Sequence, residues 1–568
     1  MTTASLVHRD DPDPAAWPPV WKVWANPIIR RYARSRLRVR GLSVGILLTL
    51  LVAGFLFFSI REGTLHRGGL EAVDANRTVL IPLLILQGII LFLLGTGQVA
   101  GAMTAEADEG VIEYQRLAPM SPLSKVIGYL FGLPIREYVL CAVTMPFSIW
   151  ALWRGEVPLG IGLQLYTVFF SSAILYHLTG LVAGTVVKNR RWAFLASMGL
   201  VFLLYTVMPQ LANFGLVFFR YLTLLPVAGE CYPYMLPRDA GAVALAAQNL
   251  LPSARFFNLD LPQAAFTLLS QGVLILTGLV MLWRRWRKAE SHLLGKAWAT
   301  GLFGWIQLVL LGNSLPLIDP GYLFPSRELN RFTGRFQMSG DWKPELVEAV
   351  VMTGLFGLTS LLMMWVITSM ITPNAEGRLR GWRRTRKLGR QRLSPLSDPA
   401  TGFWWILVMV AMAAAGWFIF TNAVVGSHWF PGYALPPHAL GAFLLVMATG
   451  GLGFHALLES RGGRFVGLVV IVVGVVPIMA GTIVALISDL LAVPATWLIA
   501  ISPWMAPFYA AAILIPLPDM PVDLVRAMPR AFWFWQATGA LVTLRLIAGL
   551  RQALRKVAVQ AAEDEGTS

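Results

Sequence analysis

The feature that most restricts the fold of this sequence is a series of apolar runs, each long enough to cross a lipid bilayer. Runs such as 41–60 and 465–487 match the length of about 20 apolar residues that a transmembrane helix needs. Only 13% of the residues are charged, whereas soluble domains carry about 25%. Backbone groups in lipid need partners within the same structure, and these runs are continuous rather than alternating. The sequence therefore predicts an all-α polytopic membrane protein.

The order of these runs predicts about twelve transmembrane helices in two six-helix halves. Before the last span of each half lies a Pro-interrupted apolar stretch, 211–227 and 494–516, which is interpreted as a re-entrant or split element. A Pro-Leu-Ser tripeptide follows the second span of each half, which gives modest support to an internal repeat.

The predicted spans of the first half are 41–60, 79–98, 135–153, 159–187, 192–209 and 264–283, and those of the second are 299–318, 347–371, 402–421, 439–458, 465–487 and 531–550. The predicted domains are a cytoplasmic N-terminus with an amphipathic entry helix (1–40), the two six-span halves (41–288 and 299–550), a cytoplasmic connector (289–298) and a cytoplasmic tail (551–568).

The net charge of +16 is concentrated beside the apolar runs, at 30–40, 188–191, 284–288 and 378–392. Cytoplasmic loops carry such an excess of Lys and Arg, and these residues also attract anionic lipid headgroups. This placement predicts an inner (plasma) membrane protein with both termini in the cytoplasm. It argues against a nucleic-acid partner, which is the weaker interpretation of the charge.

Motifs for catalysis or cofactor binding are missing from the sequence. Gly295-Lys296 lacks the first glycine and the Ser or Thr of a phosphate-binding P-loop. His455 and Glu459 share a helix face but do not form a His-Glu-x-x-His zinc motif, and two cysteines cannot build a metal site. We therefore predict no catalytic residue, no metal site and no cofactor.

The most informative segment is the acidic stretch 106–121, between the second and third predicted spans. Glu106, Glu109 and Glu113 recur at helical spacing, which predicts that they share one face of a short helix. Leu117 continues that face, and Pro119 is expected to end the helix.

This segment resembles the loop after the second span in permease subunits of the type-2 class of ABC transporters. That loop reads roughly Glu-x-x-x-Gly-Thr-x-Glu-x-Leu-x-x-Thr-Pro-x-Ser. The matching residues here are Glu106 or Glu109, Gly110, Glu113, Pro119 and Ser121, and the chain departs from the pattern at Val111, Gln115 and Ala118. The basic stretch 26–38 is similar to that family's amphipathic entry helix. The resemblance covers the first half, whereas the second half matches only in topology.

The resemblance implies a coupling helix at 106–121 that docks on a separate ABC ATP-binding subunit, with Leu117 and Ile112 as apolar anchors. The alternative is a solvated loop lying on lipid headgroups, although anionic headgroups would repel its carboxylates. The implied function is the permease subunit of an ATP-driven exporter with an unknown substrate, so the chain itself is not expected to be an enzyme. Whether two copies pair as a homodimer, or one chain forms the whole pathway, stays open.

Three further charged residues are candidates for a translocation path. Arg136 and Glu137 either mark a polar site or lie at the cytoplasmic entry of the third span, which we favour. Arg220 faces either a water-filled vestibule or the outer interface.

Two other functions remain as alternatives. The first is an ion-coupled secondary transporter, disfavoured by the scarcity of carboxylates in the spans. The second is a membrane-embedded transferase acting on lipid-linked substrates, with 319–345 as its active face.

Overall fold

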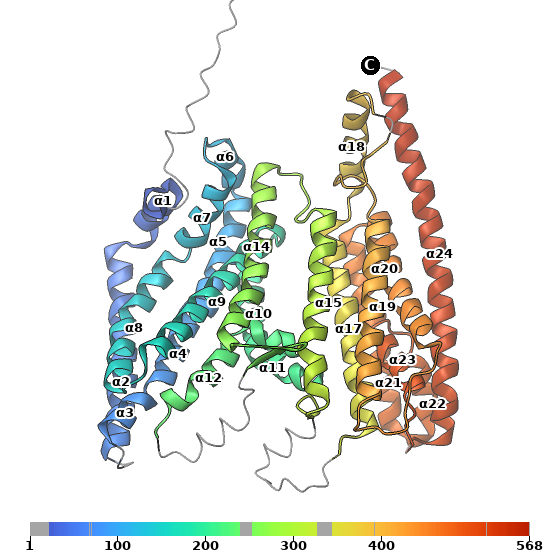
Figure 1. Ribbon diagram of the computed structural model, residues 1–568. Helices are drawn as coiled ribbons and strands as arrows, with labels where there is room; N and C mark the ends of the chain where they lie inside the picture. Colours follow the sequence, from blue (N-terminus) through green and yellow to red (C-terminus); the bar gives the residue numbers. More distant parts are fainter. Residues whose placement is uncertain are drawn as a thin grey trace, which may run out of the picture. The chain divides into compact units, whose positions relative to one another are not determined.

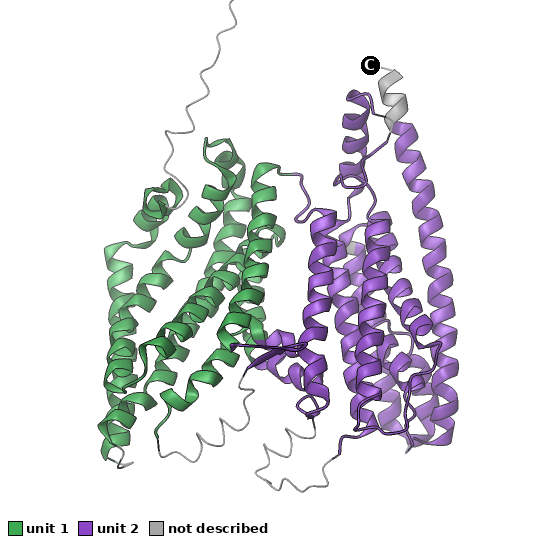
Figure 2. Cartoon of the chain, in the orientation of Figure 1, with its two compact units in different colours: residues 1–205, 221–252, 263–289 green, residues 206–220, 253–262, 290–568 purple. Residues whose placement is uncertain are grey.

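The computed structural model describes residues 22–66, 69, 71–238, 253–325, 343–390, 392–518 and 520–566. These residues form two compact units (Figure 2). Unit 1 comprises 1–205, 221–252 and 263–289, and unit 2 comprises 206–220, 253–262 and 290–568. The first predicted half therefore contributes two short segments, 206–220 and 253–262, to unit 2.

Unit 1 is built from helices of very different lengths (Figure 1). They are α1 (Pro27–Arg36), α2 (Val39–His66), α3 (Ala72–Thr78), α4 (Leu80–Gly88), the π-helical segment η3 (Ile89–Gly95), α5 (Thr96–Asp108), α6 (Val111–Leu117), α7 (Pro122–Gly132), α8 (Ile135–Arg154), α9 (Leu159–Val186), α10 (Arg190–Thr206), α12 (Leu225–Met235) and α14 (Gln263–Arg287). The segments from α3 to α5 follow one another directly, so 72–108 forms one long apolar helical element. The helix α9 packs against both α5 and α14.

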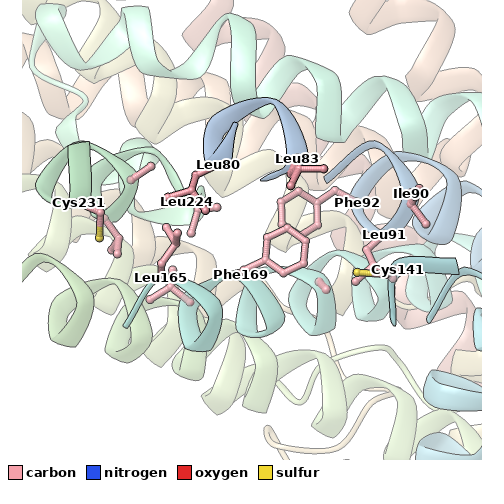
Figure 3. Close-up of a cluster of buried hydrophobic side chains, with 14 of the residues drawn as sticks. Leu80, Leu83, Ile90, Leu91, Phe92, Cys141, Leu165, Phe169, Leu224 and Cys231 are labelled. Carbon is pink, nitrogen blue, oxygen red and sulfur yellow. The ribbon is translucent and has the colours of Figure 1, made fainter. Parts of the chain in front are cut away.

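A core of apolar side chains holds α4, η3, α8, α9 and α12 together (Figure 3). Phe92 of η3 and Phe169 of α9 lie at its centre, with ring centroids 4.6 Å apart. Leu83 and Phe169 are completely buried. This core fixes the long element 72–108 against the rest of unit 1 and so positions the turn that follows it.

Unit 2 contains all the described helices of the second half. Its elements are α11 (Met208–Leu211), η4 (Ala212–Phe214), α15 (Lys296–Ile318), α17 (Leu346–Ile371), α18 (Ala375–Lys387), α19 (Phe403–Val425), α20 (Ala439–Arg461), α21 (Gly463–Ile487), η6 (Asp489–Leu491), α22 (Ala492–Ile499), α23 (Ala506–Leu514) and α24 (Val522–Gly566). A small hairpin joins β1 (Ala254–Phe256) to β2 (Leu259–Leu261), antiparallel, with Arg255 opposite Asp260. The Phe257 amide N–H donates to the Gly312 carbonyl of α15 at 2.8 Å, which attaches the hairpin to that helix.

Among the described residues, ten helices are long and apolar enough to cross a membrane. This makes the chain a multi-pass α-helical membrane protein. Two of the predicted spans are not among the ten. The helix α10 reaches the required length only together with 208–214, across a bend of 42°, and α24 is not among the helices identified by length and composition. Both Pro-interrupted stretches consist of short helices, with α11, η4 and the start of α12 in the first and α22 and α23 in the second.

Candidate functional site

The predicted coupling segment is not one helix but the end of one helix, a turn and a second short helix. The helix α5 ends at Asp108, and Gly110 has a φ of +72°, a left-handed conformation that favours glycine. A second helix, α6, then begins at Val111. The prediction that Glu106, Glu109 and Glu113 share one helix face is therefore wrong. Helical spacing breaks at Gly110, so Glu106 belongs to α5, Glu109 caps its end and Glu113 lies in the first turn of α6.

Capping groups define where α6 ends and where α7 begins. Pro119 lies beyond the end of α6, as predicted, and Ser121 is the N-cap of α7, where its hydroxyl accepts from the Ser124 N–H at 3.1 Å. The Lys125 ammonium donates to the Arg116 carbonyl at 3.1 Å and so satisfies the C-terminal end of α6. Burial, together with the charge of Arg116, lowers the pKa of Lys125. The two helices therefore hold each other in place.

The Glu106 carboxylate is bound inside unit 1. One of its oxygens accepts from the Arg31 guanidinium and the Tyr32 hydroxyl of α1, and the other accepts from the Tyr129 hydroxyl of α7 at 2.6 Å. Its side chain is only 12% exposed. Burial, and after it the charge of Glu106, raises the pKa of both Tyr32 and Tyr129. The carboxylate thus joins α1, α5 and α7 through charge-assisted hydrogen bonds.

The basic N-terminal stretch forms α1, which packs closely on α7. Asn26 caps α1 by accepting from the Ile28 N–H at 3.0 Å, and its amide donates to the Ser124 carbonyl at 2.7 Å. Two glycines of α7 allow this approach. A methyl group added at Gly128 would lie 2.8 Å from the Ile28 Cβ, and one at Gly132 would lie 2.8 Å from the Tyr32 ring. The entry helix is therefore a docked element, with its apolar face buried.

The outer face of α6 combines charged and apolar side chains. Glu113, whose side chain is 69% exposed, forms an ion pair with Arg116, whose side chain is only 19% exposed. Leu117 is 83% exposed, and Tyr114, three residues before it, is 74% exposed. Ile112, predicted as an anchor for a partner, is instead buried in the core of unit 1. Tyr114 was not predicted, although its i,i+3 spacing from Leu117 places both on one side of the helix.

A hollow of about 170 Å³ lies behind α6. Its lining comes from α5, α6, α9 and α14 and comprises Met103, Ala107, Ile112, Glu113, Arg116, Thr185, Arg285, Trp286 and Ala289. The side chains behind α6 therefore do not fill all the space there, and the hollow leaves room for the short helix to shift.

The three candidate translocation residues do not form one site within a unit. At the start of α8 in unit 1, Arg136 is exposed and its guanidinium lies beside Gly45 of α2, while Glu137 is buried. Arg220 belongs to unit 2, where it donates to the Asn213 side-chain oxygen at 2.8 Å. Arg220 is therefore part of a local contact within its interrupted element.

Unit 2 contains a buried ionic cluster that sequence reasoning did not find. Glu459 of α20 accepts from Arg378 of α18 at 3.1 Å and from the Thr401 hydroxyl at 3.0 Å, and it lies 3.0 Å from His455. The side chains of Arg378, His455 and Glu459 are at most 4% exposed. The four-residue spacing of His455 and Glu459 was visible in the sequence, but Arg378 is remote in the chain and only the fold brings it there.

Comparisons with known proteins do not assign the chain to a family, since no family model, curated protein or solved structure matches it. Within the described part of the chain, no group of three or more His, Cys, Asp or Glu side chains is placed to hold a metal ion. The fold therefore defines a class, the multi-pass α-helical membrane proteins, and the exposed end of α6 is its candidate site.

Proposed function

We propose that this chain is the permease subunit of an ATP-driven exporter of the type-2 ABC class and that a separate ATP-binding subunit docks on α6. The observation that carries the proposal is the exposure of Tyr114 and Leu117 on a short helix whose C-terminal end is held by Lys125. Aromatic and apolar side chains of this kind anchor protein partners, with charged residues such as Glu113 and Arg116 at the rim.

The proposed coupling follows the covalent connection from α6 to α5. Movement of the partner would displace α6 over the hollow behind it. Because α5 is continuous with α4 through η3, a displacement at Gly110 would be passed into the apolar element 72–108. The Glu106 contacts would carry α1 and α7 along with it.

The proposal includes a topology. We propose about twelve spans in two halves, with both termini on the cytoplasmic side of the inner (plasma) membrane. The substrate is an unidentified molecule for export. Either one chain with two halves or a homodimer forms the pathway.

The test is purification of the tagged chain from its native membrane in mild detergent, with an assay of the eluate for ATP hydrolysis. We expect an ATP-binding subunit to co-elute with the wild type and to be lost by about tenfold or more from the double variant Tyr114→Ser/Leu117→Ser. The matched control is Leu259→Ser, an exposed leucine of the β hairpin in unit 2.

Elution of the wild type alone, without ATP hydrolysis, would overturn the permease assignment. Equal co-elution with the wild type and the double variant would leave a partner in place but remove it from α6. Activity that follows an ion gradient instead of ATP would favour the secondary-transporter alternative. Turnover of a lipid-linked substrate would favour the transferase.

A further inference from the structure

A second hollow of unit 1 lies between α5 and the beginning of α10 and has a volume of about 500 Å³. Its lining includes Gln98 and Gly101 of α5 and Arg190, Arg191, Phe194 and Leu195 of α10. Two guanidinium groups thus lie beside an apolar floor. We call this hollow the α5–α10 groove. Its volume is in the range of about 300–1,000 Å³ that is usual for small-molecule sites.

Glycine contacts set the shape of the α5–α10 groove. A methyl group added at Gly97 would lie 2.8 Å from the Met198 Cγ, and one added at Gly101 would lie 3.4 Å from the Phe194 Cβ. The added methyl group at Gly101 would also lie 3.7 Å from the Cγ of Arg190. The first turns of α10 are therefore placed directly against α5, and the arginine side chains extend from a packed helix.

The two arginines of the α5–α10 groove have no ionic partner among the described residues. Arg190 and Arg191 are both exposed, and no described acidic side chain lies within salt-bridge distance of either one. By contrast, Arg31 and Arg116 of the same unit each bind a glutamate. Two adjacent unpaired guanidinium groups attract an anion.

A third cation, Arg36 at the end of α1, lies behind the α5–α10 groove. The Gln98 oxygen accepts from the Arg36 guanidinium at 3.0 Å in the amide orientation that satisfies both groups. Burial lowers the pKa of Arg36, and the charge of Arg190 acts in the same direction, while Glu137 and Glu106 oppose it. Because neither carboxylate pairs with the arginines of α10, the rim of the groove stays positive.

The arginine rim lies at the end of an apolar helix. The helix α9, which is long and apolar enough to cross a membrane, ends at Val186, and α10 begins four residues later at Arg190. Cations so close to the end of a span lie at the level of lipid headgroups, and basic pockets between spans bind anionic headgroups. The apolar floor continues from there along α10, where Leu195 is 57% exposed. A phospholipid has the same order of charged phosphate and adjoining hydrocarbon.

The apolar floor distinguishes the α5–α10 groove from a purely cationic surface of unit 1. That surface, a hollow of about 570 Å³, is lined by four arginines of 30–38 with Pro27 and Ser35. A soluble anion can bind to arginines alone. In the α5–α10 groove it would leave Phe194 and Leu195 uncovered, whereas a lipid chain would cover them. The composition of the groove therefore favours a phospholipid over a free anion.

We propose that the α5–α10 groove binds an anionic phospholipid, with its phosphate at Arg190 and Arg191 and the upper part of one acyl chain over Phe194 and Leu195. Since one wall of the groove is α5, the bound lipid would join the beginning of α10 to that helix. The proposal stands on unit 1 alone. It involves no residue of α6 and no ATP-binding subunit, so it can fail while the proposed function stands.

The experiment uses the full chain in nanodiscs of phosphatidylcholine that contain a small fraction of a photoreactive probe. The probe is phosphatidylglycerol with a diazirine in the upper part of one acyl chain, and its adducts are located by digestion and mass spectrometry. The test variant is Arg190→Gln/Arg191→Gln. The matched control is Arg38→Gln/Arg40→Gln, which removes two exposed arginines at the beginning of another span, α2.

We expect the wild type to be labelled on the peptides that contain 97–102 and 192–196. Labelling of 97–102 should fall by about tenfold or more in the test variant, because each arginine near an anionic headgroup accounts for about fivefold in affinity, and it should stay within about twofold in the control. Leu195→Ser should reduce it by about threefold or more, whereas Leu200→Ser, an exposed leucine of α10 outside the groove, should not.

Competition on the wild type tests the proposal even if the arginine variant fails to fold. Unlabelled phosphatidylglycerol in tenfold excess over the probe should reduce labelling of 97–102 by about tenfold, as expected for one shared site. Soluble glycerophosphoglycerol, which has the same headgroup without acyl chains, should leave labelling unchanged.

Four results would overturn the proposal. Equal losses in the test variant and the control would reduce the effect to net charge at the membrane surface. Competition by glycerophosphoglycerol as strong as that by phosphatidylglycerol would favour a soluble anion. Labelling that excess phosphatidylglycerol does not reduce would indicate unspecific contact with bulk lipid. Absence of adducts at both peptides would assign the groove to another part of a protein.

Discussion

Each unit contains a buried or nearly buried carboxylate that ties a helix outside the apolar core to the helices within it, but the two carboxylates are held differently. Glu106 in unit 1 is bound by two tyrosine hydroxyls and by Arg31, whose side chain is 40% exposed. Glu459 in unit 2 is bound by Arg378 and Thr401 beside His455, and its side chain is fully buried.

Because of this difference, the ion pair between Glu106 and Arg31 is easier to break than the ion pair between Glu459 and Arg378. Water can reach Arg31, so its ion pair with Glu106 is screened and contributes modestly. Arg378 and Glu459 have no such access, and separating them would leave an unpaired charge in a dry environment. The comparison indicates that the contact of α5 with α1 and α7 is weaker than the contact of α18 with α20, although both join their helices.

The helices themselves also differ in the surface that they present. The short helix α6 exposes Tyr114 and Leu117 beside Glu113, while α18 exposes Arg384 and Lys387. Surfaces that differ in this way suit different partners or different patches of one partner. Four predictions can break or sharpen this comparison, and they follow in order of expected effect.

The largest effect is expected from Arg378→Ala. This change leaves the buried Glu459 carboxylate without its cation and should cost about 3–5 kcal/mol of unfolding free energy. The measurement is the thermal or denaturant midpoint in detergent. The double variant Arg378→Met/Glu459→Gln, which removes both charges, should recover much of the loss. A loss below about 1 kcal/mol for Arg378→Ala would contradict the assignment of a sealed pair.

A smaller effect is expected from Glu106→Gln. Loss of the carboxylate weakens the bonds from Arg31, Tyr32 and Tyr129 and should cost about 1–3 kcal/mol. Because these bonds hold α1, hydrogen exchange at 27–36 should accelerate while the apolar helices stay protected. Glu109→Gln, an exposed neighbour, is the control and should leave exchange unchanged. Unaltered exchange in Glu106→Gln would show that the glycine contacts alone hold α1.

Alkaline pH should act on the same contact. The pKa values of Tyr32 and Tyr129 are raised by burial and then by Glu106, while an unfolded tyrosine has a pKa of about 10. Below about pH 10 both states keep their protons, so the contribution is constant. As pH rises further, the unfolded state ionises first and stability falls by up to about 1.4 kcal/mol per pH unit for each tyrosine. Unfolding midpoints from pH 8 to 11 should therefore fall less steeply in Tyr32→Phe and Tyr129→Phe, and equal slopes would refute this account.

The smallest effect on stability is expected from Glu113→Gln. The pair with Arg116 lies on the surface of α6, so its loss should change the unfolding free energy by no more than about 0.5 kcal/mol. Any strong effect should appear only in binding of the proposed ATP-binding subunit, measured by co-elution. A large loss of stability would place Glu113 in the structural core of unit 1 rather than on a docking face.

Much of the fold was predictable because long apolar runs leave the chain few alternatives in lipid. The runs at 41–60 and 465–487 lie in helices α2 and α21, since a backbone in hydrocarbon must satisfy its own hydrogen bonds. The predicted span 531–550 lies within α24, which is helical but is not among the ten helices identified as able to cross a membrane. The end of the helix before Pro119 could be predicted from the sequence because helix ending is a local effect.

The roles of Glu106, Ile112 and Arg378 could not be predicted in this way. The sequence determined that the chain is a bundle of apolar helices with an acidic segment after the second run, because hydrophobic length and helix periodicity are properties of neighbouring residues. Only the tertiary structure decided that Glu106 binds α1 and α7, that Ile112 is buried and that Tyr114 and Leu117 are exposed. Burial and partner choice depend on residues far away in the chain, and a single left-handed glycine at position 110 redirects every side chain that follows it.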